Sequence, residues 1–355
     1  MLNLPPGFIT TFLRSQLFTK LPYPDTSFSG QTILITGANT GLGLEAARHF
    51  VRLNATRVIL GCRSISKGES ALTEIESSCA RKGVVEVWEL DMSSYKSVKA
   101  FCARANGEGR IDVVVLNAGI AVPKYEEVEG MESTIAINVV ATFLLVVLLV
   151  PVLRRGAEKF GILPRLVVVA SDAHEQAAFK EQNSPPGEIL NTLAQNKPDL
   201  QPDRYNVSKL LEILLVRELG PLISPTPPSA STDSPKPIIL NTLTPGLCHS
   251  SLMRHAIFPL NIIARLGKAL VARTTEVGSR TLVAAAAAEW ETNGCYMADC
   301  AVREPSAWVR SEKGLETQKR VWEELREILE GIEEGCTGCV GERRELGDPR
   351  NGRMC

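Results

Sequence analysis

Apolar runs rich in valine and isoleucine alternate with helical patterns along most of this 355-residue chain. The runs lack the polar alternation of half-exposed strands, so they are typical of strands that are buried on both faces. Such strands occur in parallel sheets that are covered by helices on each side. The runs lie at 31–36, 57–61, 84–90, 111–116, 165–170 and 238–243, with a shorter one at 294–297.

Amphipathic segments fill the gaps between these runs, which completes a strand–helix alternation. This order predicts an α/β fold, a Rossmann-type doubly wound parallel sheet of about seven strands with helices on both faces in three α/β/α layers. The predicted helices cover about 42–53, 66–80, 94–106 and 204–219, one long segment that ends near Arg155, and one segment past Gly314.

The alternation defines one domain over residues 28–330, with an arm at 1–27 before it. Two stretches interrupt the rhythm. The polar segment 173–203 is expected to be an insertion on the substrate side, and the Pro- and Ser-rich segment 221–237 is expected to be a surface loop. Residues 331–355 are expected to form a disordered tail.

Charge and cysteine content exclude several classes of function. Lys and Arg number 39 against 40 Asp and Glu, so the chain lacks the basic excess of a nucleic-acid-binding protein. The nine cysteines are scattered, which argues against a disulfide framework. Cys336 and Cys339 form the one closely spaced pair, and without a second pair they predict no metal site.

The N-terminal arm carries an apolar stripe with basic residues beside it. Three interpretations remain open: a helix on a membrane surface, a transit peptide, or an arm that packs on the body of the protein. The continuous apolar h-region of a secretory signal peptide is missing from the first 24 residues. The stripe consists of Phe8, Ile9, Phe12, Leu13, Leu17, Phe18 and Leu21, with Arg14 and Lys20 alongside.

The most apolar run of the chain is 141–153. A helix that spans a membrane needs about 20 apolar residues, and this run is shorter. We therefore expect no transmembrane span. The run predicts either a buried helix or a subunit interface, and in the second case the protein would be a homodimer.

A glycine-rich turn follows the first apolar run and opens a helix. Its sequence is Thr36-Gly37-Ala38-Asn39-Thr40-Gly41-Leu42-Gly43. Glycines at such a turn allow a tight bend and close backbone approach, while the positive N-terminus of the helix favours a phosphate. The turn predicts a nucleotide-binding site.

Further motifs follow the turn in order: Asp91 after the third run, Asn117-Ala118-Gly119 after the fourth, then Asn138, Ser171, Tyr205-x-x-x-Lys209 and Pro245-Gly246. The turn and these motifs resemble the short-chain dehydrogenase/reductase superfamily, in the order that this family shows. The resemblance covers about residues 28–330 and implies a nicotinamide cofactor and a four-residue catalytic set. The implied catalytic residues are Asn138, Ser171, Tyr205 and Lys209. The implied cofactor contacts are Gly37, Asn39, Thr40, Gly41, Leu42, Gly43, Asp91, Asn117, Ala118, Gly119, Tyr205, Lys209, Pro245 and Gly246.

The end of the second apolar run indicates which cofactor is used. It reads Gly61-Cys62-Arg63, with Lys67 one helical turn further on. Sites that prefer NAD place an acid here for the ribose 2′-hydroxyl, whereas an Arg accommodates the 2′-phosphate of NADP. The segment also resembles the retinol-dehydrogenase-like branch of the family, which mostly uses NADPH. We therefore expect Arg63 and Lys67 to contact NADP(H).

The predicted catalytic residues have complementary chemistry. Tyr205 and Lys209 are four residues apart on one predicted helix, so they share a face, and a nearby ammonium lowers the pKa of a phenol. Ser171 follows the fifth run and could stabilise charge on a carbonyl oxygen. The long segment between Ser171 and Tyr205 is expected to form the outer wall of the substrate pocket, with Leu190, Leu193 and Leu200 inward and Lys180, Glu181 and Lys197 in water.

These features favour an NADPH-dependent reductase that interconverts a carbonyl and an alcohol on a lipophilic small molecule. Further resemblance to fungal reductases indicates a secondary-metabolite pathway, with a polyketide or terpenoid substrate. Two alternatives remain open: a non-redox catalyst on the same fold (a dehydratase, epimerase or cyclase), and a non-catalytic NADP-binding protein. We expect a cytoplasmic protein, with membrane association through the arm as the open alternative.

Overall fold

The computed structural model describes residues 7–228, 236–249 and 271–342. Its centre is an eight-stranded sheet in the order β10-β9-β8-β7-β4-β1-β2-β3. All neighbouring strands are parallel except β10, which pairs antiparallel with β9. The strands are β1 (Thr32–Thr36), β2 (Arg57–Cys62), β3 (Val85–Glu89), β4 (Val113–Leu116), β7 (Arg165–Val169), β8 (Ile239–Thr244), β9 (Tyr296–Ala298) and β10 (Ala301–Arg303).

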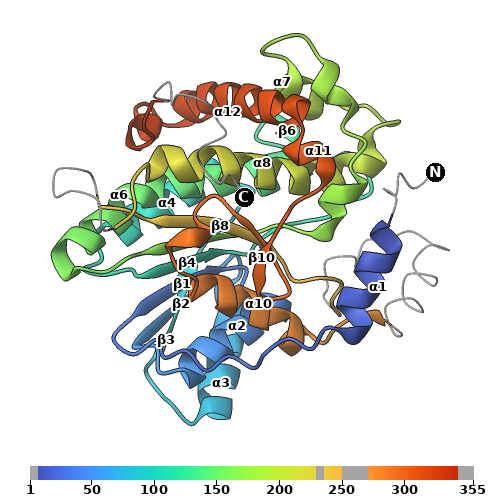
Figure 1. The fold of residues 1–355 in the computed structure, drawn as a ribbon. Helices are drawn as coiled ribbons and strands as arrows, with labels where there is room; N and C mark the ends of the chain where they lie inside the picture. Colours follow the sequence, from blue (N-terminus) through green and yellow to red (C-terminus); the bar gives the residue numbers. More distant parts are fainter. Residues whose placement is uncertain (1–6, 229–235, 250–270, 343–355) are drawn as a thin grey trace.

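Helices cover both faces of this sheet, which confirms the predicted doubly wound α/β fold (Figure 1). In β1, Leu34 belongs to one core cluster, whereas Ile33 and Ile35 belong to the other. Every residue of β1 is buried, which is the reason for the continuous apolar run in its sequence. One layer contains α2 (Gly41–Arg52), α3 (Ile65–Cys79) and α10 (Thr275–Ala286), and the other contains α4 (Tyr95–Asn106), α6 (Thr142–Phe160) and α8 (Arg204–Ile223).

The prediction of about seven strands omits β10. That strand has three residues and forms a hairpin with β9 at the edge of the sheet. Two of its residues are exposed, so it lacks the apolar run that marks the other strands. A separate two-stranded hairpin, β5 (Glu127–Val128) and β6 (Met131–Glu132), lies outside the main sheet.

A further helix, α12 (Glu312–Ile332), packs on the outside of α8 (Figure 1). A short turn after it, η7 (Cys336–Cys339), packs on α6. Cys339 Sγ donates to the carbonyl oxygen of Val147 at 3.3 Å, and Arg154 donates to the carbonyl oxygen of Cys339 at 2.9 Å. The C-terminal segment of the chain thus covers part of the apolar helix.

The apolar run 141–153 is therefore part of a core helix. The continuous helical stretch Ser133–Phe160 is long and apolar enough to cross a membrane by length and composition, but 89% of its most apolar window is buried inside the fold. This agrees with the first of the two interpretations drawn from the sequence.

The prediction of a disordered tail from residue 331 is wrong for residues 331–342. Cys336, Cys339 and Val340 pack against the larger core cluster, and the Gly341 amide donates to the carbonyl oxygen of Leu222 at 3.1 Å. Residues 343–355 lie outside the described residues. The expected loop 221–237 also begins later than predicted, because α8 continues through Pro221 to Ile223, and residues 229–235 lie outside the description.

The N-terminal arm packs on the body of the protein. Its helix α1 (Phe8–Phe18) buries Gln16, and Leu21 behind it is 1% exposed. Arg273 donates to the carbonyl oxygen of Ser15 at 2.7 Å, and Arg280 donates to that of Leu21 at 2.9 Å. Of the three interpretations of the arm, the structure supports the packed one. Ile9, Leu17 and Phe18 remain exposed on α1.

The insertion 173–203 folds into short helical segments, among them α7 (Ile189–Ala194), which packs against α12. Leu190 and Leu193 belong to the core, and the Leu190 amide donates to Glu324 Oε2 of α12 at 2.8 Å. Glu181 was expected in water but is 3% exposed and forms an ion pair with Arg204. The expectation that Glu181 lies in water is therefore wrong, whereas the expectation that residues 173–203 form a wall of the substrate pocket stays a prediction.

Candidate active site

The site residues inferred from the sequence follow the ends of different strands. Because β3, β2, β1, β4, β7 and β8 are parallel neighbours, their carboxyl ends lie along one edge of the sheet. Open α/β sheets bind ligands at this edge, where the strand order reverses. Here the order reverses between β1, which leads into the glycine-rich turn, and β4, which leads into Asn117.

Close packing explains two glycines of the turn after β1. A Cβ on Gly37, which has a φ of 65°, would lie 3.0 Å from Ala118 Cα. A Cβ on Gly43 would lie 2.7 Å from the side-chain nitrogen of Asn117. Any larger residue at either position would push the turn away from the loop after β4. The two loops therefore form one cradle at the N-terminus of α2.

Asn117 holds this cradle together. Its side-chain amide donates to the carbonyl oxygens of Thr36 and Gly37, at 3.0 and 3.2 Å. The Thr36 hydroxyl accepts from the backbone amides of Asn117 and Ala118, both at 3.0 Å. Both amide hydrogens of Asn117 are thus used within the protein, where they fix the turn.

The first turn of α2 faces this cradle. Thr40 precedes the helix in extended conformation, and its side chain makes no capping hydrogen bond. Gly41 has a φ of 63°, and a Cβ there would meet nothing within 4 Å. Asn39 and Leu42 flank these residues and are partly buried. The first amides of a helix of twelve residues are thereby available to an anion, as phosphate binding requires.

Two basic side chains lie beyond β2. Arg63 and Lys67 are exposed, and neither makes an ion pair with any residue that the structure describes. Cys62 before them is 1% exposed, and the backbone amides of Ala38 and Asn39 hydrogen-bond its sulfur. Burial raises the pKa of Cys62 to about 11, so it stays a neutral thiol beneath the turn.

The remaining residues predicted to contact a cofactor lie toward the two ends of this edge. Asp91 follows β3, and its Oδ1 accepts from the amide and the hydroxyl of Ser93 at 3.0 and 2.6 Å. Pro245 and Gly246 follow β8, where the Gly246 amide donates to the Thr244 hydroxyl at 3.1 Å. The cradle, the uncapped helix start and the basic pair fit a phosphorylated dinucleotide along the edge between these ends.

Tyr205 and Lys209 lie on α8, as the sequence predicts. Lys209 Nζ is 5.9 Å from the centre of the Tyr205 ring and donates to the carbonyl oxygen of Val169 at 2.9 Å. A Cβ on Gly119 would lie 3.6 Å from the same nitrogen. The lysine thus lies between the ends of β7 and β4, beside the cradle.

Ser171 approaches Tyr205 from the end of β7. Its hydroxyl accepts from the Ala173 amide at 3.2 Å and also hydrogen-bonds the Tyr205 phenol. Burial raises the pKa of Tyr205, and this effect outweighs the lowering by Lys209 and Ser171. The expectation that Lys209 brings the phenol pKa below its ordinary value is therefore wrong, because desolvation of the phenolate is the larger effect.

Asn138 is fully buried in a π-helical turn, η1 (Ala136–Ala141). Its Oδ1 accepts from the Ile120 amide at 2.9 Å, and its Nδ2 donates to the carbonyl oxygen of Ile120 at 2.9 Å and to Ser208 Oγ at 3.0 Å. The side chain thus joins the loop after Gly119 to α8. Single π-helical turns are frequent at functional sites.

Several side chains at the site were missed from the sequence. Glu212 pairs with Lys209, and Tyr296 donates to Asp172 Oδ1 at 2.9 Å. His174, three residues after Ser171, is 2% exposed. Of these, only Glu212 had a usable signal, since it lies three residues after Lys209 on the same helix.

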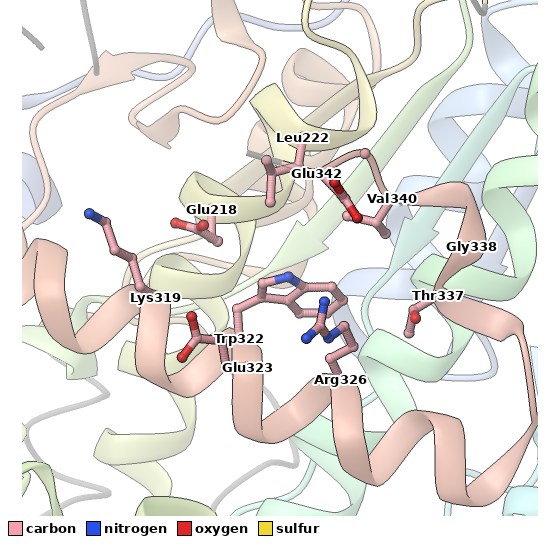
Figure 2. A pocket seen from close by; sticks show the side chains of 11 residues that line it. Glu218, Leu222, Lys319, Trp322, Glu323, Arg326, Thr337, Gly338, Val340 and Glu342 are labelled. Atoms are coloured by element: carbon pink, nitrogen blue, oxygen red, sulfur yellow. The ribbon is translucent and has the colours of Figure 1, made fainter. Parts of the chain in front are cut away.

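The described parts of the chain contain a surface groove away from this site but no metal cluster. Within them there is no group of three His, Cys, Asp or Glu side chains that could hold a metal ion. A groove of about 640 Å³ lies between α8, α12 and residues 337–342, with Trp322 at its centre (Figure 2). It lies on the outer side of α8, away from the cradle.

The chain is similar to proteins of known family over nearly its whole length. It is 45% identical to the short chain dehydrogenase/reductase dmxR8 of Cryptosporiopsis sp. over 92% of this chain and 98% of that protein. It is 44% identical to the short chain dehydrogenase atnD of Emericella nidulans over 84% of this chain and 93% of that protein. Residues 31–182 match the short chain dehydrogenase family model.

The chain belongs to the short-chain dehydrogenase/reductase family. The resemblance to fungal enzymes of this family is thereby confirmed. Solved structures agree on the fold: an uncharacterised protein from Mycobacterium paratuberculosis superposes with a TM-score of 0.60 at 26% identity over 86% of this chain and 95% of that one. RhlG of Pseudomonas aeruginosa, in a complex with NADP, superposes with a TM-score of 0.56 at 22% identity over 78% and 97% of the two chains.

Proposed function

We propose that this protein is an NADPH-dependent reductase that converts a carbonyl of a lipophilic small molecule into an alcohol. The observation that carries the proposal is the convergence of Ser171, Tyr205 and Lys209 beside the glycine cradle at one sheet edge. A protein that only bound a nucleotide would need the cradle but not a phenol, a hydroxyl and an ammonium next to it.

Ser171 and Tyr205 both act on the carbonyl oxygen in this reaction. When bound, NADPH supplies the hydride. Ser171 hydrogen-bonds the carbonyl oxygen and holds it near the phenol. Tyr205 donates its proton from Oη to that oxygen as negative charge develops. Since burial raises the pKa of Tyr205, the phenol is protonated at neutral pH, which suits reduction better than oxidation.

NADP(H) is favoured over NAD(H) by the residues after β2. Exposed Arg63 and Lys67 offer two positive charges where an acid would bind a ribose 2′-hydroxyl. A guanidinium matches the geometry of a phosphate. The cradle residues Gly37, Gly41 and Gly43 would hold the pyrophosphate, and Asp91 the adenine. RhlG binds NADP on the same fold, and a 3-ketoacyl-(acyl-carrier-protein) reductase of Brucella melitensis binds NADH, so the fold alone leaves the choice open.

A fungal secondary-metabolite pathway is the proposed setting, with a polyketide or terpenoid substrate. The similarity to dmxR8 and atnD supports a fungal setting. We propose a cytoplasmic protein, in which exposed Ile9, Leu17 and Phe18 of α1 offer contact with a membrane surface.

The test is NADPH consumption by the purified protein with a panel of hydrophobic ketones and aldehydes, with product mass recorded. Reduction adds two hydrogens and consumes one NADPH for each product. A product that forms without consumption of NADPH would support the alternative, a dehydratase, epimerase or cyclase. Mass spectrometry of the compound that accumulates when the protein is absent would then identify the substrate.

A further inference from the structure

A buried carboxylate lies next to the proposed catalytic lysine. Glu212 is 2% exposed, and its two oxygens accept from Lys209 Nζ at 2.8 and 3.0 Å. The same nitrogen donates to the carbonyl oxygen of Val169 at 2.9 Å. An ammonium has three N–H donors, so these three acceptors match its full capacity. Glu212 therefore controls both where Lys209 donates and how much of its charge reaches neighbouring groups.

Three charged groups act on the Tyr205 phenol from the elements packed around it. Lys209 on α8 lowers the pKa of the phenol, whereas Glu212 on α8 and Asp172 after β7 raise it. Lys209 and Glu212 carry opposite charges within hydrogen-bonding distance, so their effects on the phenol partly cancel. Because the site is buried and its effective dielectric constant is low, removal of either charge should change the pKa of the phenol strongly.

We propose that Glu212 is a positioning residue that acts through Lys209: its carboxylate adds to the effect of burial in keeping the Tyr205 phenol protonated, and so shifts the pH range in which the site can donate a proton. The proposal rests on the proposed function, in which Tyr205 protonates a carbonyl oxygen. It assigns Glu212 no contact with substrate.

The protonation state of Glu212 gives this arrangement a pH dependence. Burial raises the pKa of Glu212 to about 7, although Lys209 opposes the effect. Above this pH the carboxylate is charged, compensates Lys209 and opposes ionisation of Tyr205. Replacement of Glu212 by Gln removes that charge at every pH, so Tyr205 should ionise at a lower pH in the variant.

The first experiment compares pH–rate profiles of carbonyl reduction. In Glu212→Gln the alkaline limb should move to lower pH, and at one fixed pH on that limb the rate should fall roughly tenfold, as loss of one nearby charge predicts. Oxidation of the alcohol should gain rate at neutral pH for the same reason. Glu212→Asp keeps the charge and should retain the wild-type profile in large part.

Glu218 provides a matched control. It is 4% exposed on the same helix and accepts from Gln318 Nε2 at 2.8 Å, so Glu218→Gln also neutralises a buried carboxylate. This variant should keep the wild-type pH profile. Equal shifts in Glu218→Gln and Glu212→Gln would overturn the proposal, because the effect would then come from general loss of buried charge.

The second experiment needs no activity. Ultraviolet titration of tyrosinate is recorded in the wild type and in Glu212→Gln, each with and without Tyr205→Phe, so that the difference isolates Tyr205. The proposal predicts ionisation at lower pH in Glu212→Gln, and an unchanged titration would overturn it.

If the wild type reduces no carbonyl, the proposed function fails while this titration still decides the role of Glu212. Should Glu212→Gln fail to fold, Glu212→Asp decides: a wild-type titration supports the proposal and a shifted one contradicts it.

Discussion

Gln16 of the N-terminal helix lies directly against Gly246 in the loop after β8. A Cβ on Gly246 would clash with the side-chain amide of Gln16, and the φ of Gly246 is 73°. With its amide oriented to satisfy both atoms, Gln16 also pairs with the backbone amide and carbonyl of Leu247. The arm therefore supports the loop that closes one end of the proposed cofactor site.

Replacement of Gly246 by Ala should destabilise this loop for two reasons, its positive φ and the clash with Gln16. The φ strain costs about 1–3 kcal/mol, and the clash adds to it. We expect a lower melting temperature and weaker NADPH binding, measured by thermal unfolding and by fluorescence titration. Gly130→Ala is the control, since Gly130 has a φ of 76° but a Cβ there would meet nothing within 4 Å. If Gly246→Ala destabilises the protein no more than Gly130→Ala does, the contact with Gln16 does not contribute to stability.

Arg63→Ala should reduce the preference for NADPH over NADH. A charge-assisted hydrogen bond to the 2′-phosphate contributes about 1.5–3 kcal/mol, so the affinity for NADPH should fall roughly 10- to 150-fold while that for NADH changes little. Titration of both cofactors measures this. Arg303→Ala removes an exposed arginine of β10 and should leave both affinities unchanged. Equal loss for the two cofactors in Arg63→Ala would contradict a 2′-phosphate contact.

Tyr205→Phe should abolish reduction and keep cofactor binding within a few-fold. General acid catalysis contributes about 10²–10⁴ in rate, and the phenyl ring still packs beside Lys209. Single-turnover kinetics and NADPH titration separate the two effects. Tyr95→Phe serves as control, because Tyr95 is a buried phenol on α4 whose hydroxyl donates to Met131 Sδ at 3.9 Å. Full turnover by Tyr205→Phe would favour another acid or a non-redox reaction.

The sequence was sufficient to predict the sheet and the motif residues because both depend on local pattern. Ile33 and Ile35 face one core cluster and Leu34 the other, so three consecutive apolar residues indicate a strand that is buried on both faces. The glycine turn is likewise local. The fit of this turn against Ala118, however, requires the ends of β1 and β4 to lie side by side. In the sequence, only the order of the motifs indicates that arrangement.

Features that depend on contacts distant in the sequence were not predictable in the same way. Leu193 stands in a polar insertion of the sequence, and its packing in the core depends on the contact between α7 and α12. Cys339 likewise packs on α6 only because the chain returns there after α12. The raised pKa of Tyr205 depends on how deeply α8 is buried, whereas the spacing to Lys209 is all that the sequence displays.

The ion pair between Glu181 and Arg204 should contribute to stability more than to substrate choice. Arg204 is fully buried, so Glu181→Gln would leave a buried charge without its partner, at a cost of about 3–5 kcal/mol. Chemical denaturation measures the loss, and the KM for a carbonyl substrate should stay within a few-fold. Glu188→Gln, at an exposed position of the same insertion, should be neutral. A changed KM with unchanged stability would support the interpretation of this segment as a substrate wall.

His174 should make the fold sensitive to acid. Its Nδ1 lies 2.8 Å from the carbonyl oxygen of Ser171, and its Nε2 accepts from the Ser306 amide at 3.2 Å, so the ring bridges the loop after β7 and the segment before α11 (Ala307–Arg310) as a neutral group. Burial lowers the pKa of His174 to about 4, whereas an exposed histidine titrates near pH 6.5. Between these values the unfolded chain binds a proton that the folded chain excludes.

The stability supplied by neutral His174 is therefore complete above about pH 6.5, falls as the pH is lowered, and levels off below about pH 4, a loss of about 3 kcal/mol. A protonated ring would also lose the acceptor for Ser306.

His174→Gln cannot titrate, so its free energy of unfolding should be lower at neutral pH but should depend less on pH between 6.5 and 4. His249→Gln, at an exposed position, should keep the wild-type slope. Denaturant unfolding at several pH values tests this, and equal slopes in His174→Gln and the wild type would show that His174 is not the group that excludes the proton.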